Sequence, residues 1–146
     1  MKKAALIAVC IIMLAALCAC TGGESDETES TSGKTVTFVN GITDADVWIL
    51  PETQENLKTT VWGKATLPGI KAGESRKFPL CEPGDDGLYI LRVIDTGGFF
   101  FSANGIALDD GMTLKITGDD RQALKAVVTS PGDTVTGEYE LFSARL

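Results

Sequence analysis

From residue 34 to the C-terminus, the sequence is built of short β-branched and aromatic runs, each ended by Gly, Pro, Asn or Asp. Residues 112–117 alternate apolar and polar side chains, which is the period of a strand with one buried face. Residues 88–95 are apolar on both faces for most of their length, so we expect them to form a central strand. No window longer than ten residues after Gly33 shows a convincing helical period. The pattern predicts an all-β domain.

Turn residues divide this domain into roughly seven to nine expected strands. They lie at residues 35–39, 45–50, 75–80, 88–95, 99–102, 112–117, 123–129 and 134–143, with a further short strand at 61–67. Residues 51–60 are polar and irregular and are expected to form a long loop. Short strands at this spacing favour a single antiparallel β-sandwich, with a partly open β-barrel as the alternative.

The N-terminus has the features of an export signal. A basic start, Met1-Lys2-Lys3, precedes an unbroken run of 16 apolar residues at 4–19. This run is shorter than the roughly 20 residues that a membrane-spanning helix needs, so residues 1–19 are predicted to be a cleaved signal peptide.

The sequence Leu17-Cys18-Ala19-Cys20 resembles the lipobox of bacterial lipoproteins. The resemblance implies that Cys20 receives a diacylglycerol and becomes the mature N-terminus. Two acyl chains give a stable membrane anchor. The expected location is the cell envelope, on the outer side of the cytoplasmic membrane, or in the outer membrane if the host has one.

Residues 20–33 are predicted to be the lipidated cysteine and a flexible acidic linker. Residues 21–33 contain three Gly, four acidic residues, six Ser or Thr and no apolar side chain. Such a segment buries too little apolar surface to offset the entropy lost on ordering. The folded domain is therefore expected to span residues 34–146.

Several short segments of the domain resemble small secreted β-domains of uncharacterised bacterial lipoproteins. They are Phe38-Val39-Asn40, Val47-Trp48-Ile49, Leu67-Pro68-Gly69, Gly73-Glu74-Ser75 and Leu91-Arg92-Val93-Ile94-Asp95. These are turn and strand residues that many β proteins share, and the resemblance implies no activity.

Composition excludes several classes of function. The chain has no His, which removes Ser-His-Asp and Cys-His nucleophiles and HExxH zinc sites. Its net charge of −7 argues against nucleic-acid binding. Cys81 is the only cysteine of the predicted domain, so no intrachain disulfide is expected there. We expect no cofactor and no enzymatic activity; a small carboxylate-based hydrolase is an alternative.

Aromatic residues are the candidate ligand contacts. Trp62 is expected to be the most exposed and is a possible ligand contact, whereas Trp48 and Tyr89 are expected in the core. In an extended strand, Phe99 and Phe101 share one face and Phe100 takes the other. These rings could form a stacking surface for sugars.

Acidic residues gather in the expected turns and suggest a calcium site. If residues 61–67 form a strand, an up-and-down order places one set of turns at one end of the sandwich. The candidates in that set are Asp44, Asp46, Asp95, Asp119 and Asp120. The alternative is that these aspartates only form turns, because their side chains bond the local backbone.

Cys81 precedes Glu82, and Asp85 and Asp86 follow shortly. Acidic neighbours do not favour a thiolate, so we expect Cys81 to be a small apolar residue that ends a strand at the edge of the core. Taken together, the sequence predicts a lipid-anchored, non-catalytic binding or structural module of the envelope. Its expected partners are the membrane, through the N-terminal lipid, and an envelope protein or a glycan. A calcium-dependent ligand-binding sandwich is the other alternative.

Overall fold

The structure is a computed structural model that describes residues 31–119, 121 and 123–145. Its elements, in chain order, are β1 (Thr31–Asn40), β2 (Ala45–Pro51), α2 (Gln54–Lys58), β3 (Leu67–Ile70), β4 (Ser75–Cys81), β5 (Tyr89–Asp95), β6 (Phe99–Ile106), β7 (Thr113–Thr117), β8 (Lys125–Thr129), β9 (Val135–Glu140) and β10 (Phe142–Arg145).

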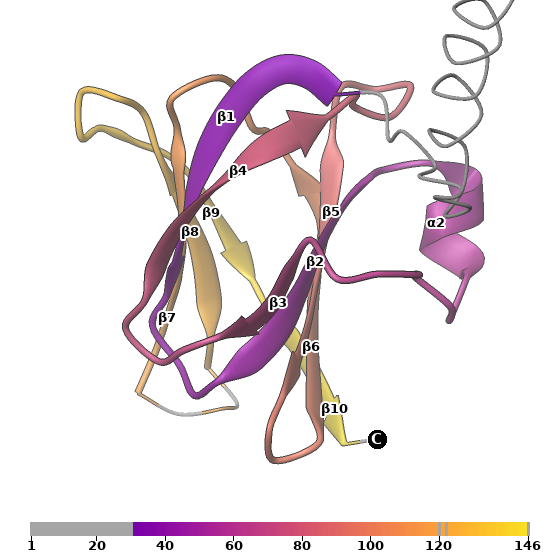
Figure 1. The fold of residues 1–146 in the computed structure, drawn as a ribbon, viewed down its shortest axis with the longest axis vertical. Helices are drawn as coiled ribbons and strands as arrows, with labels where there is room; N and C mark the ends of the chain where they lie inside the picture. The colour runs from indigo at the N-terminus through magenta and orange to yellow at the C-terminus, as the bar shows by residue number, and fades with distance from the viewer. Residues whose placement is uncertain (1–30, 120, 122, 146) are drawn as a thin grey trace, which may run out of the picture.

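The strands form two sheets that face each other, as Figure 1 shows. Sheet A has the order β4-β1-β7-β8-β9, and sheet B has the order β10-β6-β5-β2-β3. The two sheets are not joined into a closed barrel. The predicted all-β sandwich is therefore confirmed, and the alternative of a partly open barrel is not observed among the described residues.

The core fills the space between the two inner faces. Leu91 and Val93 of β5 meet the opposite sheet, where Val36 and Phe38 of β1 are also fully buried. β5 lies in the middle of sheet B, between β2 and β6, and both neighbours are antiparallel to it. The prediction of a central strand at residues 88–95 is confirmed.

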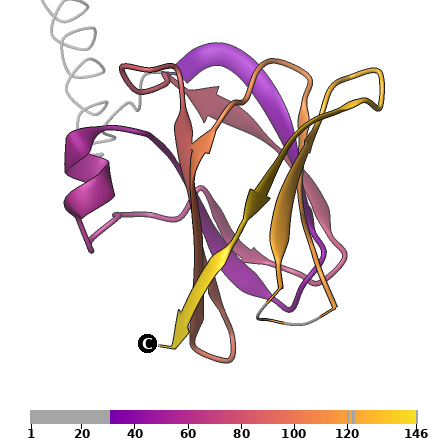
Figure 2. The same ribbon diagram turned by 180° about the vertical axis from the view of Figure 1, so that it is seen from behind.

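Two features of the strand pairing depart from the predicted antiparallel hairpins. β1 pairs in parallel with β7, so sheet A is mixed. The expected strand at 134–143 divides at Leu141: β9 pairs with β8 in sheet A, and β10 pairs with β6 in sheet B. The buried side chain of Leu141 marks the point where the chain passes from one sheet to the other, a path visible in Figure 2.

β1 starts before the predicted domain boundary. Thr31 pairs with Cys81, and the Ser32 hydroxyl donates a 2.8 Å hydrogen bond to the Leu80 carbonyl. The register then shifts before Thr35, and Gly33 takes a positive φ of 74° that favours glycine. The linker prediction is therefore wrong for residues 31–33, because the end of β4 supplies backbone partners. Residues 20–30 lie outside the described residues.

The connection between β2 and β3 also differs from the predictions. The expected loop at 51–60 contains α2, whose N-cap is Thr53: its hydroxyl accepts a hydrogen bond from the Asn56 N–H at 3.1 Å. The strand expected at 61–67 does not form, since β3 runs from Leu67 to Ile70 and includes Pro68. Proline is tolerated there because β3 is an edge strand.

The turn between β1 and β2 is fixed by Asn40 and Gly41, as their turn signal predicts. The buried Asn40 amide donates to the carbonyls of Thr43, Ile70 and Lys71. A Cβ at Gly41 would lie 2.0 Å from the Ile116 carbonyl oxygen of β7. Glycine is required here by close packing against the neighbouring strand.

Candidate functional site

Three aromatic rings gather on the outer face of sheet B. We call Trp48, Trp62 and Phe100 the aromatic cluster. The Trp62 and Phe100 rings stack with centroids 5.3 Å apart, and the Trp48 and Trp62 rings meet edge to face at 5.6 Å. Trp48 belongs to β2 and Phe100 to β6, whereas Trp62 comes from the connection between β2 and β3. Three separate segments therefore build one aromatic surface.

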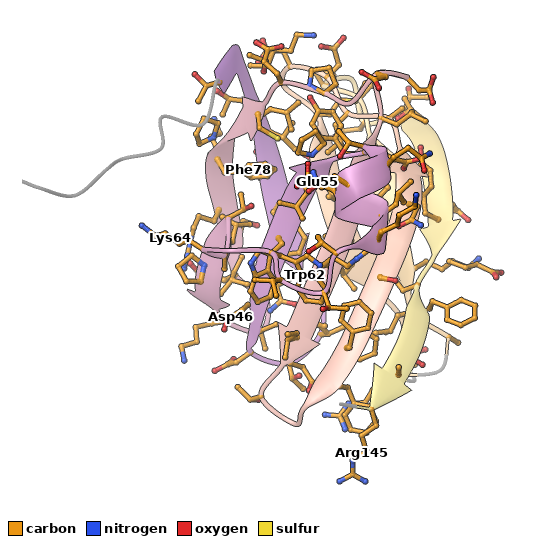
Figure 3. The ribbon with its side chains drawn as sticks, turned by 90° about the vertical axis from the view of Figure 1, so that its right-hand side faces the viewer. Asp46, Glu55, Trp62, Lys64, Phe78 and Arg145 are labelled. Atoms are coloured by element: carbon orange, nitrogen blue, oxygen red, sulfur yellow. The ribbon has the colours of Figure 1, made fainter. Side chains whose placement is uncertain are left out.

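Residues 52–66, which we call the strap, pass over the outer face of sheet B together with α2. Figure 3 shows the strap in front of the strands, with Trp62 close to the sheet. The Trp48 indole N–H donates to the Gly63 carbonyl at 3.2 Å, and the Trp62 indole N–H donates to the Thr59 carbonyl at 3.0 Å. The Thr66 hydroxyl accepts from the Ile49 N–H at 3.0 Å. The Trp48 indole thus ties the strap to β2, and the Trp62 indole bonds within the strap, so both indole N–H groups have backbone partners.

The outer face of sheet B is unusually well buried beside the aromatic cluster. Ile90 is fully buried although its neighbours Tyr89 and Leu91 face the core. Arg92 is buried as well, and its guanidinium donates to Asn104 Oδ1 at 2.8 Å. Burial lowers the pKa of Arg92, and the negative charge of Glu52 partly offsets that shift. The guanidinium stays protonated because its reference pKa is so high.

Two large apolar side chains are strongly exposed on the elements that border the aromatic cluster. Val61, next to Trp62 in the strap, is 80% exposed, and Phe142 of β10 is 83% exposed. Phe142 stands beside Ser102 of β6 in the sheet register, two residues from Phe100. Both side chains add exposed apolar surface to the strap and to β10.

The predictions for the individual aromatic residues had mixed outcomes. Tyr89 is buried, and Phe99 and Phe101 stack with each other on the side opposite Phe100, as expected. Trp48, however, is half-buried on the outer face and not in the core. The alternation of β2 carries the signal, because Val47 and Ile49 occupy the core-facing positions. Trp62 is half-buried against Phe100, so its exposure is partial.

Phe142 was not singled out from the sequence, and its exposure is a finding of the structure. The adjacent apolar pair Leu141-Phe142 is the signal that interrupts the alternation of the predicted strand. Leu141 turns into the core, and Phe142 turns out on the next sheet.

Asp95 is the most buried of the calcium candidates that the structure describes, with a side chain that is 1% exposed. Its carboxylate accepts the N–H groups of Gly97 and Phe99 at 2.8 and 2.9 Å and pairs with Arg121 at 3.1 Å. The Thr43 hydroxyl donates to it at 3.4 Å. These contacts hold the turn between β5 and β6. Asp95 therefore acts as a turn-forming residue, which was the alternative to a calcium ligand.

Asp44 and Asp46 are also held by local partners. Asp44 pairs with Lys71 at 2.8 Å, and this hydrogen bond and one from the Ala72 N–H lower the pKa of the carboxyl group. Asp46 accepts the Gly69 N–H at 2.7 Å. The Asp44 contacts join the β1–β2 turn to the residues after β3, and the Asp46 contact joins β2 to β3. Neither carboxylate points to a site shared with Asp95.

The turns that carry these aspartates do share one end of the sandwich, at the bottom of Figure 1. A cavity of about 260 Å³ there is lined by Thr43, Asp95, Asp119 and Arg121, together with apolar side chains. Asp119 is exposed, and Asp120 lies outside the described residues. Among the described residues, no three His, Cys, Asp or Glu side chains gather closely enough to hold a metal ion. The turns share one end as expected, although the strand at 61–67 and the up-and-down order on which that expectation rested do not form. The described carboxylates do not converge.

Cys81 occupies the place expected for it, as the last residue of β4 and half-buried against the core. Its Sγ lies 3.8 Å from the Ile49 carbonyl oxygen, and its own carbonyl accepts the Tyr89 hydroxyl at 2.8 Å. Burial raises the pKa of Tyr89 to about 12, with smaller contributions from nearby acidic groups. Through these contacts, Cys81 packs as a structural residue at the edge of the core.

Cys20, the predicted site of lipid attachment, lies outside the described residues. Within the described part of the chain, no helix is long and apolar enough to cross a membrane. No protein-family model matches the chain, and neither the curated proteins nor the solved structures contain a match.

Proposed function

We propose that this protein is a lipid-anchored, non-catalytic binding module of the bacterial envelope. In this proposal Cys20 carries the lipid, and the sandwich presents the aromatic cluster to an envelope protein. The observation that supports the binding role is the Trp62–Phe100 stack on the outer face of sheet B, bordered by the exposed Val61. Aromatic residues are enriched in protein interfaces, and charged residues are depleted at the centres of those interfaces.

A protein partner is favoured over a glycan because of where the indole N–H groups point. Trp48 and Trp62 both donate to carbonyls of the strap, so their polar atoms are already satisfied. What they offer outward is apolar ring surface, which suits the buried centre of a protein interface. A glycan partner remains an outcome that the experiment below distinguishes.

The anchor is tested by metabolic labelling of the full chain with a palmitate analogue. We expect label on the wild-type protein and none on Cys20→Ala, with the wild-type protein recovered in the membrane fraction. Continued labelling of Cys20→Ala would contradict the assignment of the lipid site. This experiment does not depend on the role of the aromatic cluster.

The binding surface is tested with the full chain in detergent, incubated separately with solubilised envelope proteins and with peptidoglycan sacculi. We expect a complex with envelope proteins that Trp62→Ala weakens by roughly tenfold or more, since central aromatic residues dominate interfaces. Trp62→Phe keeps a ring against Phe100 and is expected to retain most of the binding. Val135→Ala, a change at an exposed apolar residue of sheet A, is the matched control.

Equal binding by Trp62→Ala and wild type would contradict the proposed surface. Binding to sacculi, with none to envelope proteins, would replace the protein partner by a glycan. Turnover of an envelope polymer that a single carboxylate substitution abolishes would overturn the non-catalytic role in favour of a hydrolase.

A further inference from the structure

β10 is an edge strand of sheet B with little to prevent another strand from pairing with it. All four of its residues are exposed, and Phe142 is 83% exposed. Among the described residues, β6 is the only strand that pairs with it, and Figure 3 shows it at the outer edge of the sheet above the labelled Arg145. An exposed edge strand of this kind is a template for pairing with another chain.

The other three edge strands carry features that block pairing. β3 contains Pro68, and β4 contains Pro79 and an exposed Lys77. β9 carries Glu138 and Glu140, both exposed, so two copies of β9 would bring like charges together. β10 has neither a proline nor an acidic residue. Among the edge strands of the described residues, three therefore carry a proline or a pair of acidic residues, whereas β10 carries neither, and its one charged residue, Arg145, is at the end of the strand.

We propose that β10 pairs in antiparallel fashion with β10 of a second copy of this chain, so that two copies of sheet B become one continuous sheet. Antiparallel pairing of a strand with itself is two-fold symmetric, and each copy then contributes the same contacts. The proposal goes beyond the binding role of the aromatic cluster, and β10 is the element that carries it.

The side-chain directions in β10 restrict the register of this pairing. Phe142 pairs with Ser102 and Ala144 with Phe100, so both point to the outer face of sheet B. Residues directly opposite in a sheet share a face, so Phe142 must meet another outward residue. A two-fold axis at Ser143 satisfies this condition, because it places Phe142 of each copy opposite Ala144 of the other.

This register also explains why a large side chain is exposed beside a small one. Ala144 is exposed and lies next to Phe100 in the register, and its small side chain leaves room for Phe142 of the second copy to pack against it. Arg145 is on the opposite face, where its guanidinium lies 5.8 Å from the centre of the Phe99 ring. The positive charge is thus kept away from the row formed by Phe100, Ala144 and the second Phe142. The contact is self-complementary, which favours a second copy over an unrelated peptide.

Pairing through four residues buries less surface than a stable interface in solution requires. We therefore expect association to be weak in dilute solution and favoured where copies are concentrated on one membrane. The proposed anchor at Cys20 would supply that concentration. The register itself does not depend on the anchor.

Cysteine cross-linking of the full chain in its own membranes tests the proposal. In Ser143→Cys the two introduced residues face each other with Cα atoms about 5 Å apart, a separation that a disulfide spans. In the control Arg145→Cys they are separated by four residues along the strands, about 13 Å. With copper phenanthroline as oxidant, we expect Ser143→Cys to give a disulfide-linked band at twice the chain mass that disappears on reduction. This band should be roughly tenfold stronger than the band from Arg145→Cys. The wild type accounts for cross-links through Cys81.

A second pair of variants separates specific pairing from chance collision. Phe142→Lys, combined with Ser143→Cys, removes the apolar contact and adds an edge lysine, so the doubled band should fall roughly tenfold. Val135→Lys in the same background is the control, since Val135 is 53% exposed on β9. Palmitate label in the same gel shows whether the anchor is present, so loss of anchoring is distinguished from loss of pairing.

Three results would overturn the proposal. One is a doubled band of equal intensity from Ser143→Cys and Arg145→Cys. Another is a band that Phe142→Lys leaves unchanged. The third is a cross-link from Ser143→Cys to a chain of another mass in place of the doubled band, which would make β10 the edge for a different protein.

Discussion

Replacement of Leu91 by alanine tests the architecture at its centre. Leu91 is fully buried in β5, and its register neighbours are Ile49 on β2 and Ala103 on β6. Removing the buried branch forfeits about 2 to 2.5 kcal/mol of transfer free energy, at about 0.8 kcal/mol per methylene. The cavity left behind adds to this, because neighbouring strands restrain collapse. We expect the free energy of unfolding to fall by about 3 to 4 kcal/mol.

Urea unfolding, followed by tryptophan fluorescence and by far-UV circular dichroism, measures this loss. Coincident transitions from the two probes would justify a two-state treatment. Val61→Ala is the matched control, since Val61 is 80% exposed, and it should change the stability by less than about 0.5 kcal/mol. A loss below about 1 kcal/mol for Leu91→Ala would refute the central position of β5.

Three further changes probe particular contacts. A fragment of residues 31–146 should be more stable than one of 34–146 by about 1 kcal/mol in urea unfolding, because the shorter one lacks the hydrogen bond from Ser32 to β4; equal stability would contradict that role. Because the pKa of Tyr89 is raised to about 12, its stabilising effect is complete below about pH 10 and is lost as the pH rises to about 12. Tyr89→Phe should flatten the alkaline fall of stability, and an unchanged slope would count against it. Gly41→Ala should cost about 3 kcal/mol or more by thermal unfolding, since its Cβ would collide with the backbone of β7; a near-neutral change would show that β7 can move.

Local sequence patterns predicted the strands of this fold well where one face or both faces are apolar. β5 is recognisable because its side chains are buried on both faces of the sheet. Alternate residues face the core, and most of the residues between them are buried on the outer face. The alternation of residues 112–117 likewise matches β7, with Leu114 and Ile116 in the core. In these segments the period of burial and the period of the sequence agree.

Contacts between distant segments were beyond the reach of these patterns. The parallel pairing of β1 with β7 joins residues more than 70 positions apart, as in Thr37 with Thr113. The extension of β1 to Thr31 depends on β4, and nothing in a polar linker composition signals it. Both departures depend on partner strands that lie far away in the sequence, and a local pattern does not specify such partners.

The candidate site was predicted in part. Trp62 was predicted to be a possible ligand contact, but the segment around it was expected to be a strand, because Val61-Trp62 has strand-forming side chains. In the structure this segment is held by indole hydrogen bonds to backbone carbonyls, which no periodicity reveals. α2, with five residues, is too short to show a helical period.

The central claim, that the strap side of sheet B is the binding surface, is tested most directly by photo-crosslinking in living cells. A photoreactive amino acid is placed at Val61, which is exposed beside Trp62, or at Val135 on sheet A as the control. We predict a discrete adduct with an envelope protein from position 61, its loss in the Trp62→Ala background, and no such adduct from position 135. Identical adducts from both positions, or an adduct from position 61 that Trp62→Ala leaves unchanged, would contradict the claim.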